Sequence, residues 1–108
     1  MTIEIRISEN GQQDIKNIWR GLAEYRLEIA DKQIKRIQQK ISLLSKFPLA
    51  GRERSDISPN LRSVPVDRLV VFYHIDQKDD RTIVEIDRII DGTRDLSSLF
   101  DDPESEEI

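Results

Sequence analysis

The chain begins with a segment in which apolar and polar residues alternate. Isoleucine occupies positions 3, 5 and 7, and polar residues stand between them. A period of two is typical of a β-strand with one buried and one wet face. Asn10-Gly11 ends this pattern, and Asn10 with Gln13 three residues later resembles a capping box. We therefore expect a strand that is followed by a helix capped at Asn10.

A helical pattern follows and extends to Phe47. Apolar residues recur three and four positions apart, first at Ile15, Ile18, Trp19 and Leu22, and then at Leu27, Ala30, Ile34, Ile37, Ile41 and Leu44. A single helix over this stretch would be long for a globular domain. We predict a helical hairpin with its break at residues 25–27. It should end around Phe47, because Pro48 interrupts the helical hydrogen bonds and Gly51 permits a left-handed turn.

The residues after Pro48 have strand character. Residues 61–66 predict a strand in which Pro65 takes an edge or outward-facing position. Residues 69–75 form a continuous, mostly apolar run that predicts a central strand buried on both faces. A polar hairpin loop at 77–80 then leads to a partner strand at 82–90. The predicted order is β-α-α-β-β-β, an α+β fold with an N-terminal strand and a helical hairpin packed on a small antiparallel β-sheet.

Composition and charge indicate one small domain with an acidic tail. The chain has 108 residues and a net charge of −4, and five of its 21 acidic residues lie in residues 101–108. The remainder carries 17 basic and 16 acidic residues, which is less basic than nucleic-acid binders usually are. We expect one domain at 1–100 and a disordered tail at 101–108. No apolar run approaches the roughly 20 residues of a membrane span, and cysteine is absent, so we expect a cytoplasmic protein.

Arginines cluster around the predicted strands. Their residue type suits binding of an acidic or anionic partner, because a guanidinium is permanently charged and makes bidentate contacts. The alternative is that each forms a pair within the chain, as Arg88 could with Asp67 or Asp95. Arg88 shares parity with Val84, Ile86 and Ile90, which places it among apolar neighbours. The candidate binding residues, with one tyrosine of the central strand, are Arg52, Arg54, Arg62, Arg68, Tyr73, Arg88 and Arg94.

Several short motifs, in order and spacing, resemble the ParE branch of the RelE/ParE toxin superfamily. They are Pro48-x-x-Gly51-Arg52, Leu61-Arg62-Ser63, Phe72-Tyr73, Arg88-Ile89-Ile90 and Gly92-Thr93-Arg94-Asp95. The resemblance covers about residues 3–100. It implies the toxin of a type II toxin–antitoxin system, neutralised by a cognate ParD-like antitoxin that wraps the helical hairpin and sheet. ParE members are described as poisons of DNA gyrase, whereas RelE members cleave messenger RNA on the ribosome.

The residues do not favour catalysis. Cleavage of RNA needs a proton acceptor, a donor for the leaving oxygen and cations for the phosphate, and arginine supplies only the last. His74 is the one histidine, and Tyr73 should lie on the opposite face of its strand. Many family members carry a histidine where this chain has Asp91. We predict a gyrase-binding toxin with no catalytic residues, no cofactor and no metal, and with no sequence-specific DNA binding of its own.

Two alternatives remain open. One is a ribosome-dependent endoribonuclease of the RelE type, in which Glu53, Glu85 or Asp91 would need a raised pKa to act as the base. The other is an inactive descendant that retains only the binding of its partner.

Overall fold

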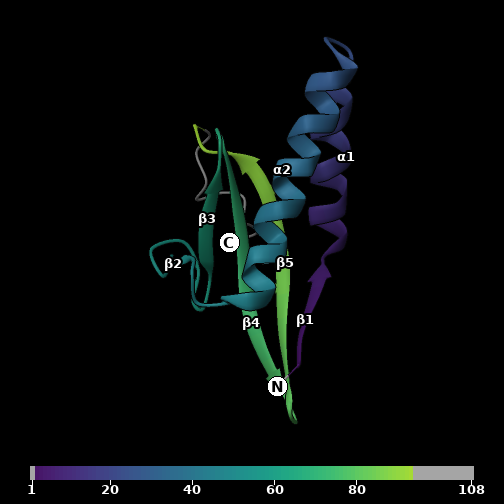
Figure 1. Cartoon of the computed structure of the whole chain (residues 1–108). Helices are drawn as coiled ribbons and strands as arrows, with labels where there is room; N and C mark the ends of the chain where they lie inside the picture. The colour runs from purple at the N-terminus through teal and green to yellow at the C-terminus, as the bar shows by residue number, and fades with distance from the viewer. Residues whose placement is uncertain (1, 94–108) are drawn as a thin grey trace.

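The fold has two helices and five strands. The computed structural model describes residues 2–93. Along the chain the elements are β1 (Thr2–Ile7), α1 (Glu9–Ala23), α2 (Leu27–Lys46), β2 (Arg52–Glu53), β3 (Arg62–Val66), β4 (Leu69–Lys78) and β5 (Arg81–Asp91). The helical hairpin lies on one side of the sheet, and its tip extends beyond the end of the sheet (Figure 1). The α+β class is confirmed, and the hairpin breaks near the predicted residues 25–27, since α1 ends at Ala23 and α2 begins at Leu27. The predicted domain end at residue 100 and the tail lie outside the described residues.

The five strands form one sheet in the order β1-β5-β4-β3-β2. The predicted central strand, β4, lies in the middle, and Pro65 on β3 is exposed as expected. The expectation of an antiparallel sheet holds for β2 to β5 but is wrong for β1, which pairs parallel to β5. An alternating pattern shows which face of a strand is buried but not the direction of its neighbour, so the sequence left this direction open.

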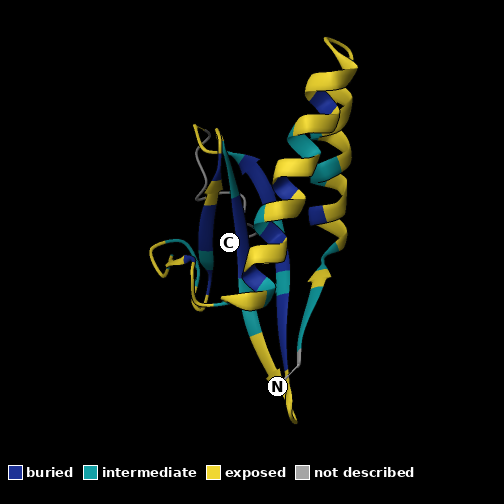
Figure 2. Ribbon diagram, viewed as in Figure 1, coloured by how far each residue is buried: buried dark blue, intermediate teal, exposed yellow. Residues whose placement is uncertain are grey.

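The main core lies between the hairpin and the sheet. Ile37, Ile41 and Leu44 of α2 pack with residues of the sheet that include Val71, Tyr73, Val84 and Ile86. Neighbouring residues of a strand point to opposite faces, so Phe72 belongs to the other face, where it packs with Leu61 and Ile90 in a smaller cluster. Figure 2 shows the buried residues concentrated in the strands and along one side of α2. Leu27, at the start of the predicted stripe, is 59% exposed.

Ser8, and not Asn10, caps the first helix. The Ser8 hydroxyl accepts a hydrogen bond from the Gly11 N–H at 2.9 Å, as an N-cap side chain does, and donates one to the Asp87 carbonyl at 2.9 Å. The Ser8 N–H donates to the Ile86 carbonyl at 2.9 Å. The predicted capping box at Asn10 and Gln13 is therefore wrong. The chain enters the helix two residues earlier because Ser8 also continues the contacts of β1 with β5.

Neither helix within residues 2–93 combines the length and the apolar character that a membrane span requires.

Replacing Ser8 with Ala should lower the free energy of unfolding by about 1–2 kcal/mol, because both the helix cap and the bond to β5 are lost. Asn10→Ala is the matched control. Asn10 is exposed, so its loss should change stability by less than about 0.5 kcal/mol. Urea denaturation of the two variants measures this difference, and equal effects would contradict the assignment of the cap.

Candidate functional site

Tyr73 fastens the segment after the hairpin to the sheet. Its side chain is buried, its hydroxyl donates to the Pro48 carbonyl at 2.8 Å, and it accepts from the Gly51 N–H at 2.8 Å. A Cβ at Gly51 would collide with the Tyr73 ring and hydroxyl, which accounts for glycine there. Desolvation by burial raises the pKa of the Tyr73 phenol. Tyr73 is thus a structural residue and offers no surface to a partner.

Arg62 serves the same segment. Its guanidinium donates to the Gly51 carbonyl at 2.8 Å and approaches the Leu49 carbonyl and the Glu53 carboxylate at 3.5 and 3.4 Å. Only 20% of the side chain is exposed. The structure therefore brings Arg62 and Tyr73 together around Gly51, where they hold the connection between α2 and β3.

Arg54 packs over the smaller core, whereas Arg52 is exposed. The Arg54 guanidinium lies 5.7 Å from the centre of the Phe72 ring and forms an ion pair with Asp56 at 3.2 Å. The hydrogen bond from Arg54 lowers the pKa of the Asp56 carboxyl group. Arg52 lies on β2, and its guanidinium forms no hydrogen bond or ion pair with the described part of the chain.

Arg88 is paired with Asp14 of α1. Its guanidinium forms a bidentate contact at 2.8 and 3.0 Å, and this hydrogen bonding raises the pKa of Arg88. The same carboxylate accepts the Ile89 N–H at 2.9 Å. The pairing within the chain was expected, but with another partner: Asp67, one of the two acids suggested, pairs with Arg36 at 2.7 Å. The other, Asp95, lies outside the described residues.

A β-bulge explains why the strand parity of Arg88 was misjudged. In the pairing of β4 with β5, Phe72 lies opposite Arg88 and Tyr73 lies opposite Ile86, so Asp87 is the extra residue. After the bulge, Arg88 shares the face of Phe72 and not that of Val84 and Ile86. Sequence alternation alone contains no signal for this shift.

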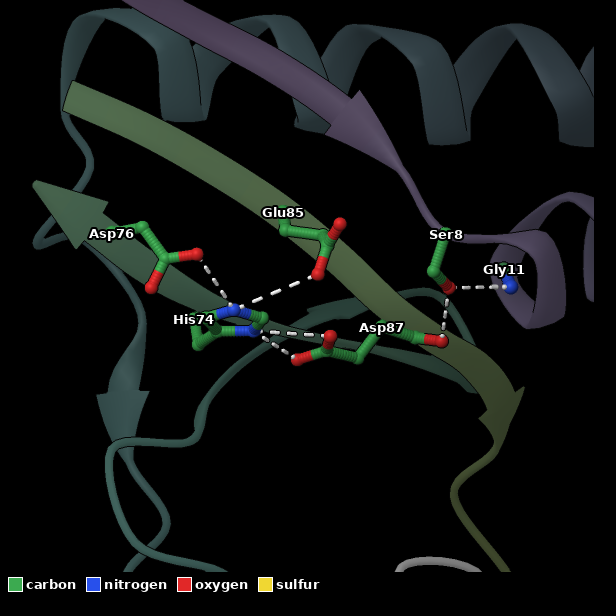
Figure 3. Close-up of polar contacts among 6 residues, drawn as sticks. All are labelled: Ser8, Gly11, His74, Asp76, Glu85 and Asp87. Atoms are coloured by element: carbon green, nitrogen blue, oxygen red, sulfur yellow. Dashed lines mark hydrogen bonds and ion pairs between the residues drawn. The ribbon is translucent and has the colours of Figure 1, made fainter. Parts of the chain in front are cut away.

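His74 lies among three carboxylates, an arrangement that the sequence analysis missed (Figure 3). Its Nδ1 is 2.8 Å from Asp87, and its Nε2 is 3.2 Å from Asp76 and 3.6 Å from Glu85. Alternation within β4 places Asp76 on the face of His74. The pairing of His74 with Glu85, and alternation within β5, place Glu85 and Asp87 on the same face. As predicted, Tyr73 lies on the other face. Ligand atoms of His74, Glu85 and Asp87 lie within 4.8 Å of one another, close enough to share a metal ion.

The pKa values of this cluster are shifted. Desolvation lowers the pKa of His74, but the hydrogen bond and charge of Asp87, with the charges of Asp76 and Glu85, outweigh it and raise the pKa above its usual value. Desolvation raises the pKa of Asp87, against the opposing influence of His74.

Arg68 borders a groove between the hairpin and the end of the sheet. This hairpin groove has a volume of about 510 Å³, and its lining includes Ile18, Gly21 and Leu22 of α1 together with Arg68, Leu69 and Ile89. Arg68 is exposed. Of the remaining candidates, Arg94 lies outside the described residues. The predicted binding residues therefore do not form one cluster: two hold the segment after α2, two pair with carboxylates, and Arg52 and Arg68 lie apart on the surface.

Replacing Tyr73 with Phe should lower the free energy of unfolding by about 1–3 kcal/mol, because it leaves the buried Gly51 N–H without an acceptor. Tyr25→Phe is the control, since Tyr25 is 84% exposed. Chemical denaturation of both variants measures the difference. If Tyr73→Phe were as stable as Tyr25→Phe, the hydroxyl would not link the loop to β4.

Stability should fall as the pH rises from about 6.5 upward. A histidine with a raised pKa in the folded state contributes stability that is fully present below its unfolded pKa, near 6.5, and is lost as the pH passes through the folded value. The charges facing His74 are Asp76 and Glu85 on its Nε2 side and Asp87 on its Nδ1 side. His74→Gln should flatten this part of the profile of unfolding free energy against pH. An identical slope in the variant would contradict the role of His74.

Comparisons with known proteins agree with this fold. Residues 5–96 match the family model described as "ParE toxin of type II toxin-antitoxin system, parDE". A relative named Toxin ParE3, from Caulobacter vibrioides, is 35% identical over 86 residues, which are 79% of this chain and 82% of the relative. A chain of a solved structure described as "Chromosomal ParDE TA system from P. aeruginosa" matches with a TM-score of 0.71 and 16% identity, over 83% of this chain and 96% of that chain. The protein belongs to the ParE toxin family of type II toxin–antitoxin systems.

Proposed function

We propose that this ParE-family toxin acts in the cytoplasm by binding and inhibiting DNA gyrase, and that a ParD-like antitoxin neutralises it. Membership of the ParE family supports both partners. The proposal assigns no chemical step to the toxin. It also assigns it no sequence-specific contact with DNA, since the net charge is −4.

The carboxylates around His74 are the observation that favours a toxin acting by binding over one that cleaves RNA. A ribonuclease would need its proton acceptor beside a phosphate and beside free cations. Here the carboxylates of Asp76, Glu85 and Asp87 lie within 3.6 Å of the imidazole, so that each ring nitrogen faces at least one acid. Three negative charges repel a phosphodiester, and even a protonated imidazole leaves the group net negative.

The nearby arginines do not compensate for this charge. Arg62 lines the same depression as His74 and Asp76, but its guanidinium is engaged with the Gly51 carbonyl and Glu53. Arg88 is neutralised by Asp14. This part of the chain therefore supports a toxin that acts by contact, and it does not favour the RelE-type alternative.

Arg52 is the arginine of the α2–β3 connection that is best placed to meet a carboxylate of a partner. It is exposed, whereas Arg62 is needed by the fold. Substitution of Arg62 would therefore change both partner binding and the stability of the fold. Arg52→Ala tests partner binding without removing a contact that the fold needs.

The toxin, purified away from its antitoxin, should inhibit supercoiling by gyrase and should leave messenger RNA intact on translating ribosomes. His74→Ala should inhibit gyrase as the unaltered toxin does, because no proton transfer is involved. A gel assay of plasmid supercoiling and primer extension on the messenger RNA measure the two activities.

Cleavage of messenger RNA that His74→Ala abolishes, with gyrase unaffected, would overturn the proposal in favour of the RelE type. Growth that is unimpaired by the unaltered toxin in cells lacking the antitoxin, with gyrase active, would indicate an inactive descendant.

A further inference from the structure

β1 forms one edge of the sheet, and no strand within residues 2–93 pairs with its outer side. The strand order places β5 on one side of β1 and leaves the other side open. An open strand edge is a template for pairing with another chain, and proteins commonly blunt it with proline, lysine or a bulge. β1 has none of these: its sequence is TIEIRI, and its register with β5 runs without a shift from Thr2 to Ile7. This edge is therefore suited to accept a further strand.

The hydrogen bonds of β1 show which backbone groups face outward. The Ser8 N–H donates to the Ile86 carbonyl of β5 at 2.9 Å. Successive residues of a strand direct their N–H and C=O groups to alternate sides, so those of Ile3, Ile5 and Ile7 point away from β5. The Ile7 carbonyl agrees with this, because it accepts a hydrogen bond from the Gln12 side chain at 2.9 Å. A second strand would thus bond to the three isoleucines.

The side chains of β1 suit a neighbour on both faces. Ile3, Ile5 and Ile7 pack against the main core but are only partly buried. Glu4 and Arg6 lie on the other face, where 38% and 49% of their side chains are exposed. They approach each other only at 3.5 Å, and an exposed ion pair of this kind stabilises little. Both charges can therefore pair across a new strand.

A second copy of β1 fits this edge in one register. Two copies related by a two-fold axis present the same patch to each other, so their strands pair antiparallel. When Ile5 faces its own copy, Ile3 faces Ile7 of the second copy, and Glu4 faces Arg6 of the second copy, twice by symmetry. The isoleucines then form the hydrogen-bonded pairs. The opposite charges form the other pairs, in which side chains lie closer together.

The neighbouring registers are disfavoured by charge. A shift that keeps the isoleucines on one face and their backbone groups in register places either Glu4 against Glu4 or Arg6 against Arg6. Like charges directly opposite each other destabilise a strand pair. The sequence of β1 therefore selects the register that is centred on Ile5.

The hairpin leaves this edge open to approach. In Figure 1, β1 forms the outer margin of the sheet, and α1 continues beyond its end. In an antiparallel pair of β1 strands, the two hairpins project from opposite ends of the joined sheet.

We propose that the free chain forms a two-fold symmetric dimer in which β1 pairs antiparallel with β1 of a second copy, centred on Ile5. The two sheets become continuous, and two Glu4–Arg6 pairs cross the interface on the helix-free face. A pair of six-residue strands buries less than the roughly 1,600 Å² of a standard interface. The dimer is therefore reversible, with a dissociation constant in the micromolar range. It is independent of the proposed inhibition of gyrase.

Cysteine substitution tests the register, because the chain contains no cysteine. The Cα atoms of a hydrogen-bonded antiparallel pair lie about 5.5 Å apart, a distance that a disulfide spans. Ile5→Cys should therefore give a disulfide-linked dimer under mild oxidation. Ile3→Cys is the matched control on the same edge and face: it lies opposite Ile7 of the second copy and about 13 Å from its own copy. Non-reducing gel electrophoresis measures the two yields.

Charge reversal tests the pairing across the interface. Arg6→Glu should weaken the dimer at least about tenfold, because Glu4 of each copy then faces an acid. The double variant Glu4→Arg/Arg6→Glu restores opposite charges and should regain the affinity. Lys16→Glu makes the same change in net charge at an exposed position of α1 and should dimerise as the unaltered chain does. Analytical ultracentrifugation over micromolar concentrations measures the dissociation constants, and thermal unfolding verifies that each variant is folded.

A chain that stays monomeric throughout the micromolar range would overturn the proposal. A dimer that is unaffected by Arg6→Glu, or that the double variant fails to restore, would place the contact elsewhere. Equal cross-linking of Ile5→Cys and Ile3→Cys would contradict the register centred on Ile5.

Discussion

The position of α1 on the sheet depends on which groups form hydrogen bonds with the edge of β5 beyond the end of β1. β1 pairs with β5 only as far as Ile86, although β5 continues to Asp91. Backbone groups beyond that point need other partners, because an unpaired buried donor or acceptor is costly. Ser8 takes the Asp87 carbonyl, and the Asp14 carboxylate takes the Ile89 N–H together with the Arg88 guanidinium. These contacts hold the first turns of α1 against the sheet, and the hairpin then projects past the sheet's end (Figure 1).

Two arginines of the site show how a charged residue in a binding-type motif can belong to the fold. Arg62 caps carbonyl groups of a segment that has no regular partner strand, and Arg88 neutralises an acid used to complete the sheet. In both cases the acceptor is distant along the chain: the Gly51 carbonyl is 11 residues from Arg62, and the Asp14 carboxylate is 74 residues from Arg88. A side chain of this kind looks available in the sequence because its partner is distant along the chain.

The sequence predicted most of the secondary structure, since the period of apolar residues changes at each boundary. The hairpin break at residues 25–27 and the central position of β4 followed from helix length and from the continuous apolar run. The parallel direction of β1 did not follow, because alternation is the same in both directions. The bulge at Asp87 was equally hidden, and with it the face of Arg88. One inserted residue in a strand thus decided which face of the sheet Arg88 occupies.

The two sides of the molecule consequently present different chemistry to a partner. On the sheet's helix-free face, acids surround the one histidine, and the local potential opposes a nucleic acid. On the hairpin side, apolar residues line an open groove, two of its acids are paired with arginines, and Arg68 forms no hydrogen bond or ion pair with the residues that the structure describes. Asp14 connects the two sides, because it pairs with Arg88 and also lines the groove between α1 and the sheet. The contact that completes the sheet therefore also forms part of the lining of that groove.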